Sequence, residues 1–350
     1  MSIPFKPAAA AVLASFASAA AFAELPGGGI CAHQGDCGEF PGNTVEAMES
    51  AVRKGAAMIE FDVQRCKSGE FVLMHDPTID KLTTGTGKIS EHTLAELKSY
   101  TLRSAKRKGL RIPTLDEVLD VIPKDGVILN VHCYAGAANV CDLVRLLEKK
   151  GRLHQSILTG NPDLVRKARK AVPAVQGNNI KRPGPRNRDW TDEENERFLS
   201  ETIASGCSYL QLSRPWPRKF SDAAHAAGVK VIYFKSDDPA SLGDLVASRG
   251  IDFVMTNRLE PMVAAFAKLP QSGGGESNLV RGDFEVDGMS GMFGWGRPLV
   301  VGGEPYRFSA RIRAKGLPAG LASIRIIDGT GEHNTAAVWA TNWFGMTLTI

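Results

Sequence analysis

The chain lacks the features that mark a membrane-spanning or fibrous protein. Beyond the first two dozen residues, no apolar run approaches the ~20 residues that a bilayer span needs. With 43% hydrophobic and 23% charged residues over 350 positions, the composition excludes wholesale disorder, collagen-like repeats and a coiled coil. The net charge of +4 is too small to indicate a nucleic-acid partner by itself. We therefore expect a globular protein with neither a transmembrane segment nor a nucleic-acid partner.

Two common motifs are also missing. No pair among the six cysteines has a C-x-x-C zinc spacing, and no G-x-G-x-x-G phosphate loop follows the first predicted strand. The cysteines are Cys31, Cys37, Cys66, Cys133, Cys141 and Cys207. Export from the cell would permit disulfides, whereas buried strand cysteines are commonly free thiols. The spacing leaves both alternatives open.

The N-terminus has the pattern of a secretory signal. Lys6 precedes an apolar run over residues 8–21, and Ala21-Phe22-Ala23 forms an A-x-A cleavage site. We predict a signal peptide over 1–23, cleaved after Ala23, and a secreted or periplasmic protein.

Residues 24–269 alternate short apolar runs with helical patterns. The predicted strands are 28–34, 58–64, 127–133, 156–160, 174–180, 208–213, 230–236 and 252–257. Strand–helix alternation indicates a parallel sheet, and eight units in this length favour a closed (β/α)8 TIM barrel of the α/β class. An open doubly wound sheet is the alternative.

More than 60 residues separate the second and third predicted strands. This insertion begins as a hairpin, in which 60–64 runs out, Ser68-Gly69 turns and 71–75 returns. Short helices are predicted over 94–99 and 115–121. Insertions after barrel strands lie on the face where chemistry occurs.

Charged and imidazole side chains gather at this face. Glu60 and Asp62 are two apart in one strand and share a face, where two carboxylates are unfavourable unless a cation or a shared proton compensates their charge. Hard divalent cations prefer such oxygen ligands. If Ser68-Gly69 is a two-residue turn, Asp62 pairs with His75 across the hairpin. His33 ends the neighbouring first strand. Two histidines beside a metal suit general acid–base chemistry, and His132, ending the third strand, is a further candidate ligand.

These residues resemble the glycerophosphodiester phosphodiesterase family over most of 30–261. The motifs are Ala32-His33-Gln34-Gly35, Pro41-Gly42-Asn43-Thr44, Glu60-Phe61-Asp62-Val63, His75-Asp76-Pro77 and Ile112-Pro113-Thr114-Leu115. The resemblance implies a barrel, a divalent cation (Ca²⁺ or Mg²⁺) and hydrolysis of a phosphodiester to an alcohol and a phosphomonoester. It also implies that His33 and His75 are the acid–base pair and that Glu60 and Asp62 bind the metal. A substrate hydroxyl would attack to give a cyclic phosphate, which water then opens.

The chain departs from this family at five positions. Gln34, Gly42, His132, Tyr134 and Asn257 stand where the family has Arg, Glu, Glu, Lys and Asp. The lost Arg and Lys would clamp a phosphate, and Gln34 cannot copy the planar fork of Arg. Lys235 and Arg214, at predicted strand ends, are the candidates to replace this charge. The basic runs 103–111 and 181–188 are expected to be solvated loops.

Three further readings remain alternatives to hydrolysis of glycerophosphodiesters. A divergent, phospholipase D-like lyase would stop at the cyclic phosphate. A non-catalytic binding protein would have lost turnover altogether. Glycoside hydrolysis needs two carboxylates flanking a sugar, and the nearby histidines suit phosphate chemistry better.

The C-terminal part has a different composition. Residues 270–277 read as a flexible linker, and 278–350 as a β-rich, jelly-roll-like module that is too short for eight strands. Trp295, Trp339 and Trp343 could stack on a glycan, although core packing is the better expectation.

Overall fold

The computed structural model describes residues 25–182, 184, 188–214 and 216–269, together with the backbone of short strands between 283 and 349. The predicted signal peptide and the linker at 270–277 lie outside the described residues. Of the described helices, none is both long and apolar enough to cross a bilayer. All six cysteines lie in the described part and are free thiols.

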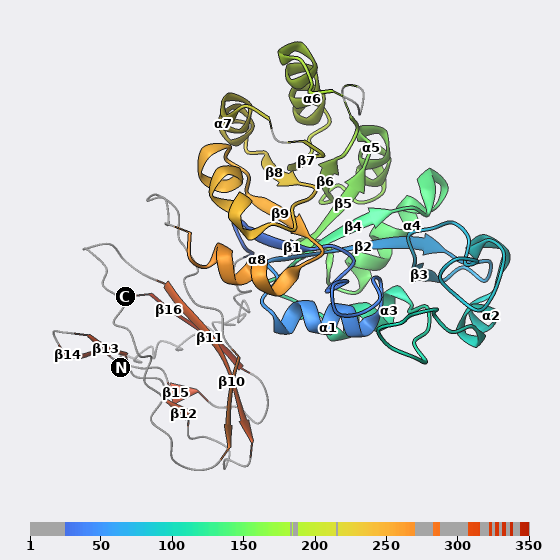
Figure 1. Cartoon of the computed structure of the whole chain (residues 1–350), viewed down its shortest axis with the longest axis horizontal. Coiled ribbons are helices and arrows are strands. Elements are labelled where there is room, and N and C mark those ends of the chain that lie inside the picture. The colour runs from blue at the N-terminus through green and yellow to red at the C-terminus, as the bar shows by residue number, and fades with distance from the viewer. Residues whose placement is uncertain are drawn as a thin grey trace, which may run out of the picture.

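Eight parallel strands close into a barrel (Figure 1). They are β1 (Gly29–Ala32), β2 (Met58–Arg65), β4 (Ile128–Cys133), β5 (Ser156–Gly160), β6 (Gln176–Asn179), β7 (Tyr209–Leu212), β8 (Lys230–Tyr233) and β9 (Phe253–Thr256). Closure is shown by β1, which pairs with β9 on one side and with β2 on the other. Each predicted strand is present, and the predicted (β/α)8 barrel is confirmed; the open-sheet alternative is excluded.

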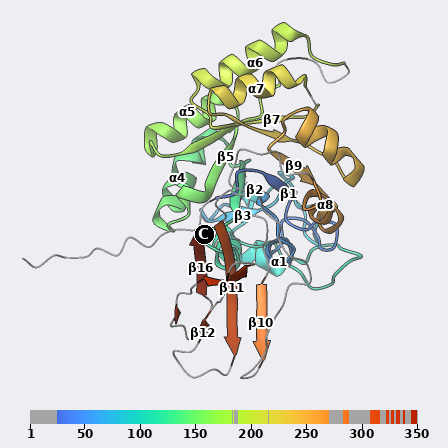
Figure 2. The ribbon, with the colours of Figure 1, turned by 90° about the vertical axis from the view of Figure 1, so that its left-hand side faces the viewer.

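Helices cover the outside of the barrel in both views (Figures 1 and 2). They are α1 (Val45–Arg53), α4 (Gly136–Lys149), α5 (Pro162–Ala171), α6 (Asp192–Ala204), α7 (Arg218–Ala226) and α8 (Leu259–Phe266), with the short helical turns Pro239–Ser241 and Gly243–Ser248 after β8. Thr191 caps α6 through a reciprocal bond pair with Glu194. Apolar residues of these helices pack on the outward faces of the strands in one large core.

A second, smaller core fills the bottom of the barrel. It includes Met58, Ile128, Ile157, Tyr209 and Phe253, one residue from each of five strands. Strand side chains alternate between faces, so positions two and four residues further along also point inward. Those positions are polar: Glu60 and Asp62 follow Met58, and Asn130 and His132 follow Ile128. The interior therefore changes from apolar to polar toward the carboxyl ends of the strands.

The insertion after β2 forms a subdomain with a small core of its own. The insertion contains β3 (Phe71–Leu73), the 3-10 turn η1 (Ile89–Glu91), α2 (Leu94–Ser99) and α3 (Leu115–Val121). The buried residues of α3 pack into the large core of the barrel instead. The strand β3 pairs antiparallel with β2, as predicted, but Val63 opposes Leu73. The predicted register was therefore wrong by one residue. Gly69 has a φ of +107°, and the turn around it is one residue longer than the predicted two-residue turn. Met74, rather than His75, therefore lies opposite Asp62.

The segment predicted to be β-rich contains strands whose backbone alone is described. Strands β10 (Asp283–Asp287), β11 (Arg307–Lys315) and β16 (Phe344–Thr349) form one sheet. Two small antiparallel pairs join β12 (Ala322–Ser323) to β15 (Ala337–Val338) and β13 (Ile326–Asp328) to β14 (Gly331–His333). Trp295, Trp339 and Trp343 lie outside the described residues, and glycan binding stays a prediction.

Candidate active site

Two buried carboxylates form the floor of the site. Glu60 and Asp62 are 4% and 1% exposed, near the carboxyl end of β2. Gln34 donates its backbone N–H to Glu60 Oε2 at 2.9 Å and its amide Nε2 to Asp62 Oδ2 at 2.8 Å. Asn43 Nδ2 donates to the same Asp62 oxygen at 2.8 Å. One oxygen of each carboxylate is therefore committed to residues of the loop between β1 and α1.

The other two carboxylate oxygens face His132. Its Nδ1 lies 3.4 Å from Asp62 Oδ1 and 3.7 Å from Glu60 Oε1. Burial and the adjacent charge of Asp62 raise the pKa of Glu60. Burial alone would lower the pKa of His132, but its contacts with Asp62 and Glu60 outweigh burial and raise it to about 9. The carboxylate pair thus creates a strongly negative potential that attracts a proton or a cation.

The donor atoms of this cluster fit a metal ion. One ligand atom each from Glu60, Asp62 and His132 lies within 4.8 Å of the others. Buried like charges are unfavourable without compensation, and carboxylate oxygens and imidazole nitrogen are ordinary ligands of divalent cations. The residues present therefore fit the divalent cation expected from the sequence.

His33 follows β1 directly and borders the carboxylates. Its Nε2 lies 3.9 Å from Glu60 Oε2, and its Nδ1 is 2.7 Å from Asn257 Oδ1 at the end of β9. The ring also packs edge-on against Phe234, with 5.3 Å between centroids. These contacts fix the ring and leave Nε2 toward the carboxylates.

His75 reaches the site from the insertion. Its Nδ1 contacts Asp76 Oδ1 at 2.8 Å, and its Nε2 lies 3.1 Å from the hydroxyl of Tyr134. The Tyr134 ring stands between the two imidazoles, 5.0 Å from His75 and 4.3 Å from His132. Burial, together with Asp62 and Glu60, raises the pKa of Tyr134 to about 12, so its hydroxyl is protonated at neutral pH.

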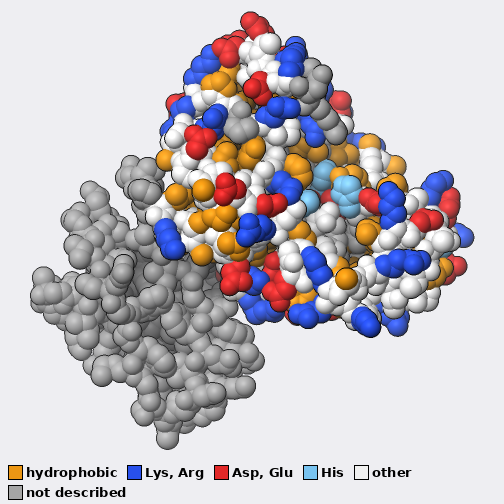
Figure 3. All heavy atoms as spheres, viewed as in Figure 1, with side chains coloured by type: hydrophobic (Ala, Val, Ile, Leu, Met, Phe, Trp, Pro, Cys, Tyr) orange, Lys and Arg blue, Asp and Glu red, His pale blue; other side chains and the backbone are white. Residues whose placement is uncertain are grey.

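These side chains share one open cavity of about 430 Å³. The space-filling view shows histidine side chains grouped at a hollow of the barrel face (Figure 3). The lining comprises His33, Glu60, Asp62, His75, His132, Tyr134, Thr159, Ile180, Arg182, Gln211, Leu212, Ser213, Phe234 and Met255. The structure therefore brings together the five predicted residues His33, Glu60, Asp62, His75 and His132.

The three predicted phosphate-contacting residues have other surroundings. Gln34 lies behind the carboxylates, with its amide committed to Asp62. Lys235 pairs with Asp237 at 2.7 Å and Arg214 with Asp189 at 3.1 Å. None of the three is among the residues that line the cavity.

Arg182 lines the cavity instead, and the sequence reasoning placed it in a solvated loop. Strand alternation would have found it. Asn178 points into the barrel from β6, and Ile180 and Arg182 continue the same two-residue period past the end of the strand, where both line the cavity.

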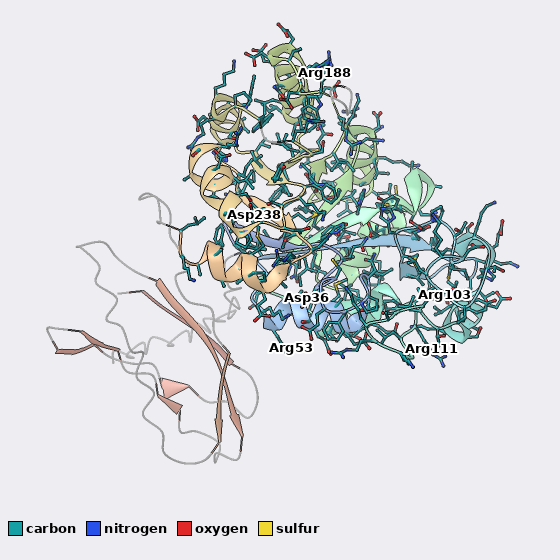
Figure 4. The ribbon with its side chains drawn as sticks, viewed as in Figure 1. Asp36, Arg53, Arg103, Arg111, Arg188 and Asp238 are labelled. Atoms are coloured by element: carbon teal, nitrogen blue, oxygen red, sulfur yellow. The ribbon has the colours of Figure 1, made fainter. Side chains whose placement is uncertain are left out.

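Figure 4 labels three arginines of the two basic runs, Arg103, Arg111 and Arg188, and each is hydrogen-bonded to a residue outside its own run. Arg103 donates to the carbonyl of Thr83, and Arg111 to that of Lys98. Arg188 makes two 2.7 Å bonds to Glu194. A second cavity of about 340 Å³ lies along the insertion, and its lining includes Arg103 and His75.

The loop that holds the carboxylates has an unusual backbone. Gln34 and Asn43 have φ values of +53° and +59°, the left-handed region that residues other than glycine seldom adopt. A Cβ on Gly42 would lie 2.5 Å from Gln34 Oε1 and 2.9 Å from Gln34 Cβ. Gly42 thus provides the space in which the Gln34 side chain reaches Asp62.

Comparisons with known proteins agree with this geometry. The model of the glycerophosphoryl diester phosphodiesterase family matches residues 33–260, more than half of the chain. A glycerophosphodiester phosphodiesterase of Caldanaerobacter subterraneus is 38% identical over 110 residues, 31% of this chain and 45% of that protein. One from Bacillus subtilis is 39% identical over 100 residues, 25% of this chain and 34% of that protein. The chain thus spans less than half of these curated relatives.

Solved structures show the same fold over the barrel. An Oleispira antarctica phosphodiesterase, solved in complex with the product sn-glycerol-3-phosphate, superposes with a TM-score of 0.58 at 23% identity. The match covers 68% of this chain and 96% of that one. A structure from Galdieria sulphuraria gives 0.59 at 20% identity, over 70% and 100% of the two chains. The family model matches more than half of the chain, and the barrel has the fold of the solved structures. We conclude that this chain belongs to the glycerophosphoryl diester phosphodiesterase family.

Proposed function

We propose that this protein is a metal-dependent hydrolase that cleaves glycerophosphodiesters to an alcohol and glycerol phosphate. The observation that carries the proposal is the arrangement of His33 and His75 in one cavity with the Glu60–Asp62–His132 cluster. Two imidazoles next to a cation-binding cluster can move the two protons that a phosphodiester cleavage requires.

The histidines are the acid–base pair in this proposal. Each ring is oriented through Nδ1, His33 by Asn257 and His75 by Asp76. His33 therefore turns its Nε2 toward the carboxylates, and His75 would exchange the contact of its Nε2 with the Tyr134 hydroxyl for one with the substrate. One takes the proton from the attacking hydroxyl of the substrate, and the other gives a proton to the departing alkoxide. Water then opens the cyclic phosphate with the two proton-transfer roles reversed, which gives glycerol phosphate.

Glu60, Asp62 and His132 would hold the divalent cation. When bound, such an ion supplies positive charge that offsets the negative charge on the phosphoryl oxygens. The chain's own part is to fix the ligands: Gln34 and Asn43 hold the carboxylates in place from behind.

Arg182 supplies the positive side chain for the anionic diester. It lines the same cavity as the two carboxylates of β2, on the segment after β6. A guanidinium can donate two parallel hydrogen bonds to a phosphate. This assignment replaces the Lys235 and Arg214 expected from the sequence.

Phosphorus NMR of a purified sample with a panel of glycerophosphodiesters and added divalent cations tests the proposal. We expect glycerol phosphate as the end product and loss of turnover in His33→Ala and His75→Ala, both with an unchanged circular dichroism spectrum. His154→Ala, at the amino end of β5, is the matched control. A cyclic phosphate that persists would favour the lyase alternative, and no product from any diester would favour a non-catalytic binding protein.

We also propose export of the mature protein, on the basis of the charged start, apolar run and Ala21-Phe22-Ala23 pattern. Mass spectrometry of the N-terminus of protein from the extracellular or periplasmic fraction checks it. A mature chain that begins at Glu24 is expected, and an intact N-terminus confined to the cytoplasm would refute export.

A further inference from the structure

The metal-binding cluster combines two oxygen donors with one nitrogen donor. Glu60 Oε1 and Asp62 Oδ1 are the carboxylate oxygens that face His132 Nδ1. With a neutral imidazole, the three side chains carry a total charge of −2, which matches a single divalent cation. The ring of His132 packs against Tyr134 with centroids 4.3 Å apart and planes inclined by 43°, which restricts rotation of the nitrogen away from the carboxylates.

The two amides that contact the carboxylates do not extend the oxygen shell. Asn43 Oδ1 accepts the backbone N–H of Asp62 at 3.0 Å while its Nδ2 donates to Asp62 Oδ2. Gln34 likewise turns its Nε2 toward Asp62. Both amides therefore present N–H donors to the carboxylates, and their oxygens are directed elsewhere. Ca²⁺ takes six to eight oxygen ligands, often with several carboxylates or carbonyls, whereas the cluster itself offers carboxylate oxygens from Glu60 and Asp62 only, with the nitrogen of His132 beside them.

We propose that this site selects a first-row transition-metal cation, of the Mn²⁺, Co²⁺ and Zn²⁺ class, over Ca²⁺ and Mg²⁺, through coordination by His132 Nδ1. Imidazole suits these ions, whereas Ca²⁺ and Mg²⁺ prefer oxygen. Three protein ligands with the remaining positions left to solvent or substrate are typical of catalytic transition-metal sites. The inference rests on the proposed function only in taking this cluster as the metal site.

Metal binding is measured on the full chain after chelator treatment, by calorimetry with CaCl₂, MgCl₂, MnCl₂, CoCl₂ and ZnCl₂. We expect Co²⁺ and Zn²⁺ to bind at least about 100-fold more tightly than Ca²⁺. Pulsed electron paramagnetic resonance of the Mn²⁺-loaded protein should show coupling to one imidazole nitrogen. Calcium affinity equal to that for Co²⁺, or the absence of nitrogen coupling, would overturn the proposal.

Variants of His132 test whether this residue supplies the coordinating nitrogen. His132→Glu should remove the Mn²⁺–nitrogen coupling and shift the metal preference toward Ca²⁺. His132→Gln should remove the same coupling without a gain in Ca²⁺ affinity. His33→Ala and His154→Ala should retain it; if His33→Ala alone abolished the signal, the ligand assignment would be wrong. Circular dichroism confirms that each variant is folded. Because these readouts need no turnover, a protein that binds Mn²⁺ through His132 yet cleaves no diester would refute the proposed function and leave this inference intact.

Discussion

The imidazole of His33, at the end of the first barrel strand, is held by the amide of Asn257, at the end of the last. The two atoms, His33 Nδ1 and Asn257 Oδ1, are 2.7 Å apart. Asn257 is fixed in turn, because its backbone N–H donates to Asp237 Oδ1 at 2.7 Å. Closure of the barrel between β1 and β9 is what brings these residues together.

Replacing Asn257 by Ala should therefore reduce kcat by about 10- to 100-fold with little change in KM, because the ring of His33 loses its orientation. Steady-state kinetics on a glycerophosphodiester checks this. Asn257→Asp should retain most of the activity, because a carboxylate can hold the same Nδ1–H. The control is Asn139→Ala, which removes an amide bound to Arg65 away from the cavity. Equal losses in the two alanine variants would contradict a positioning role.

Removing the guanidinium of Arg182 should raise KM for an anionic diester by about tenfold or more, the effect expected for a lost charge-assisted hydrogen bond. Arg188→Ala is the matched control, since Arg188 belongs to the same basic run, is paired with Glu194 and is not among the residues that line the cavity. We expect its KM to stay at the wild-type value. Competition by inorganic phosphate gives a second readout and should weaken in Arg182→Ala alone.

Gly42 and Gln34 should behave as a coupled pair. In Gly42→Ala the new Cβ displaces Gln34, whose bond to Asp62 Oδ2 is then lost. We expect metal affinity to fall by about tenfold. In a Gln34→Ala background the same substitution should cost nothing further, so the double-mutant cycle is strongly non-additive. Additive effects would show that Gly42 acts independently of Gln34.

The pair His225–Asp252 should make stability depend on pH. The 2.9 Å hydrogen bond to Asp252 raises the pKa of His225, although burial and the charges of Lys230 and Arg218 oppose it. A histidine whose pKa is raised in the folded state stabilises the fold at pH values below its pKa in the unfolded chain, about 6.5. This contribution is lost as the pH rises through the pKa of the folded state. Urea unfolding of wild type and His225→Gln should differ by less than about 1 kcal/mol at low pH, and the difference should vanish at high pH. A constant difference would refute the linkage.

The barrel was predictable because most of its strands are apolar runs separated by helical patterns. The strand β5 begins and ends at the predicted residues 156 and 160, and α3 at the predicted residues 115 and 121. The pairing of Glu60 with Asp62 on one face follows from the same alternation. These features depend on local sequence, which a pattern records directly.

The parts that were missed depend on tertiary geometry. The one-residue register shift at β3 comes from the backbone of Gly69, which the hairpin pattern alone does not determine. Lys235 looked available for phosphate, but Asp237, two residues later, binds it. Arg182 follows β6, whose residues 176–179 are polar amides and glycine rather than a typical strand sequence. Gln34, Asn43 and Asn257 stand in or beside the motifs, but their contacts with Asp62 and His33 join separate segments of the chain and depend on the tertiary fold.

Part of the insertion packs around an apolar cluster separate from both cores of the barrel. His75 comes from this insertion, whereas the three proposed metal ligands lie on barrel strands. The insertion is joined to the large core through β3 and α3, so it is one part of the fold rather than a separate body. If the proposed roles hold, a local opening confined to the insertion would withdraw one imidazole and leave the ligands of the ion in place. Loss of turnover and loss of the ion would then not coincide when this protein is heated, nicked or engineered.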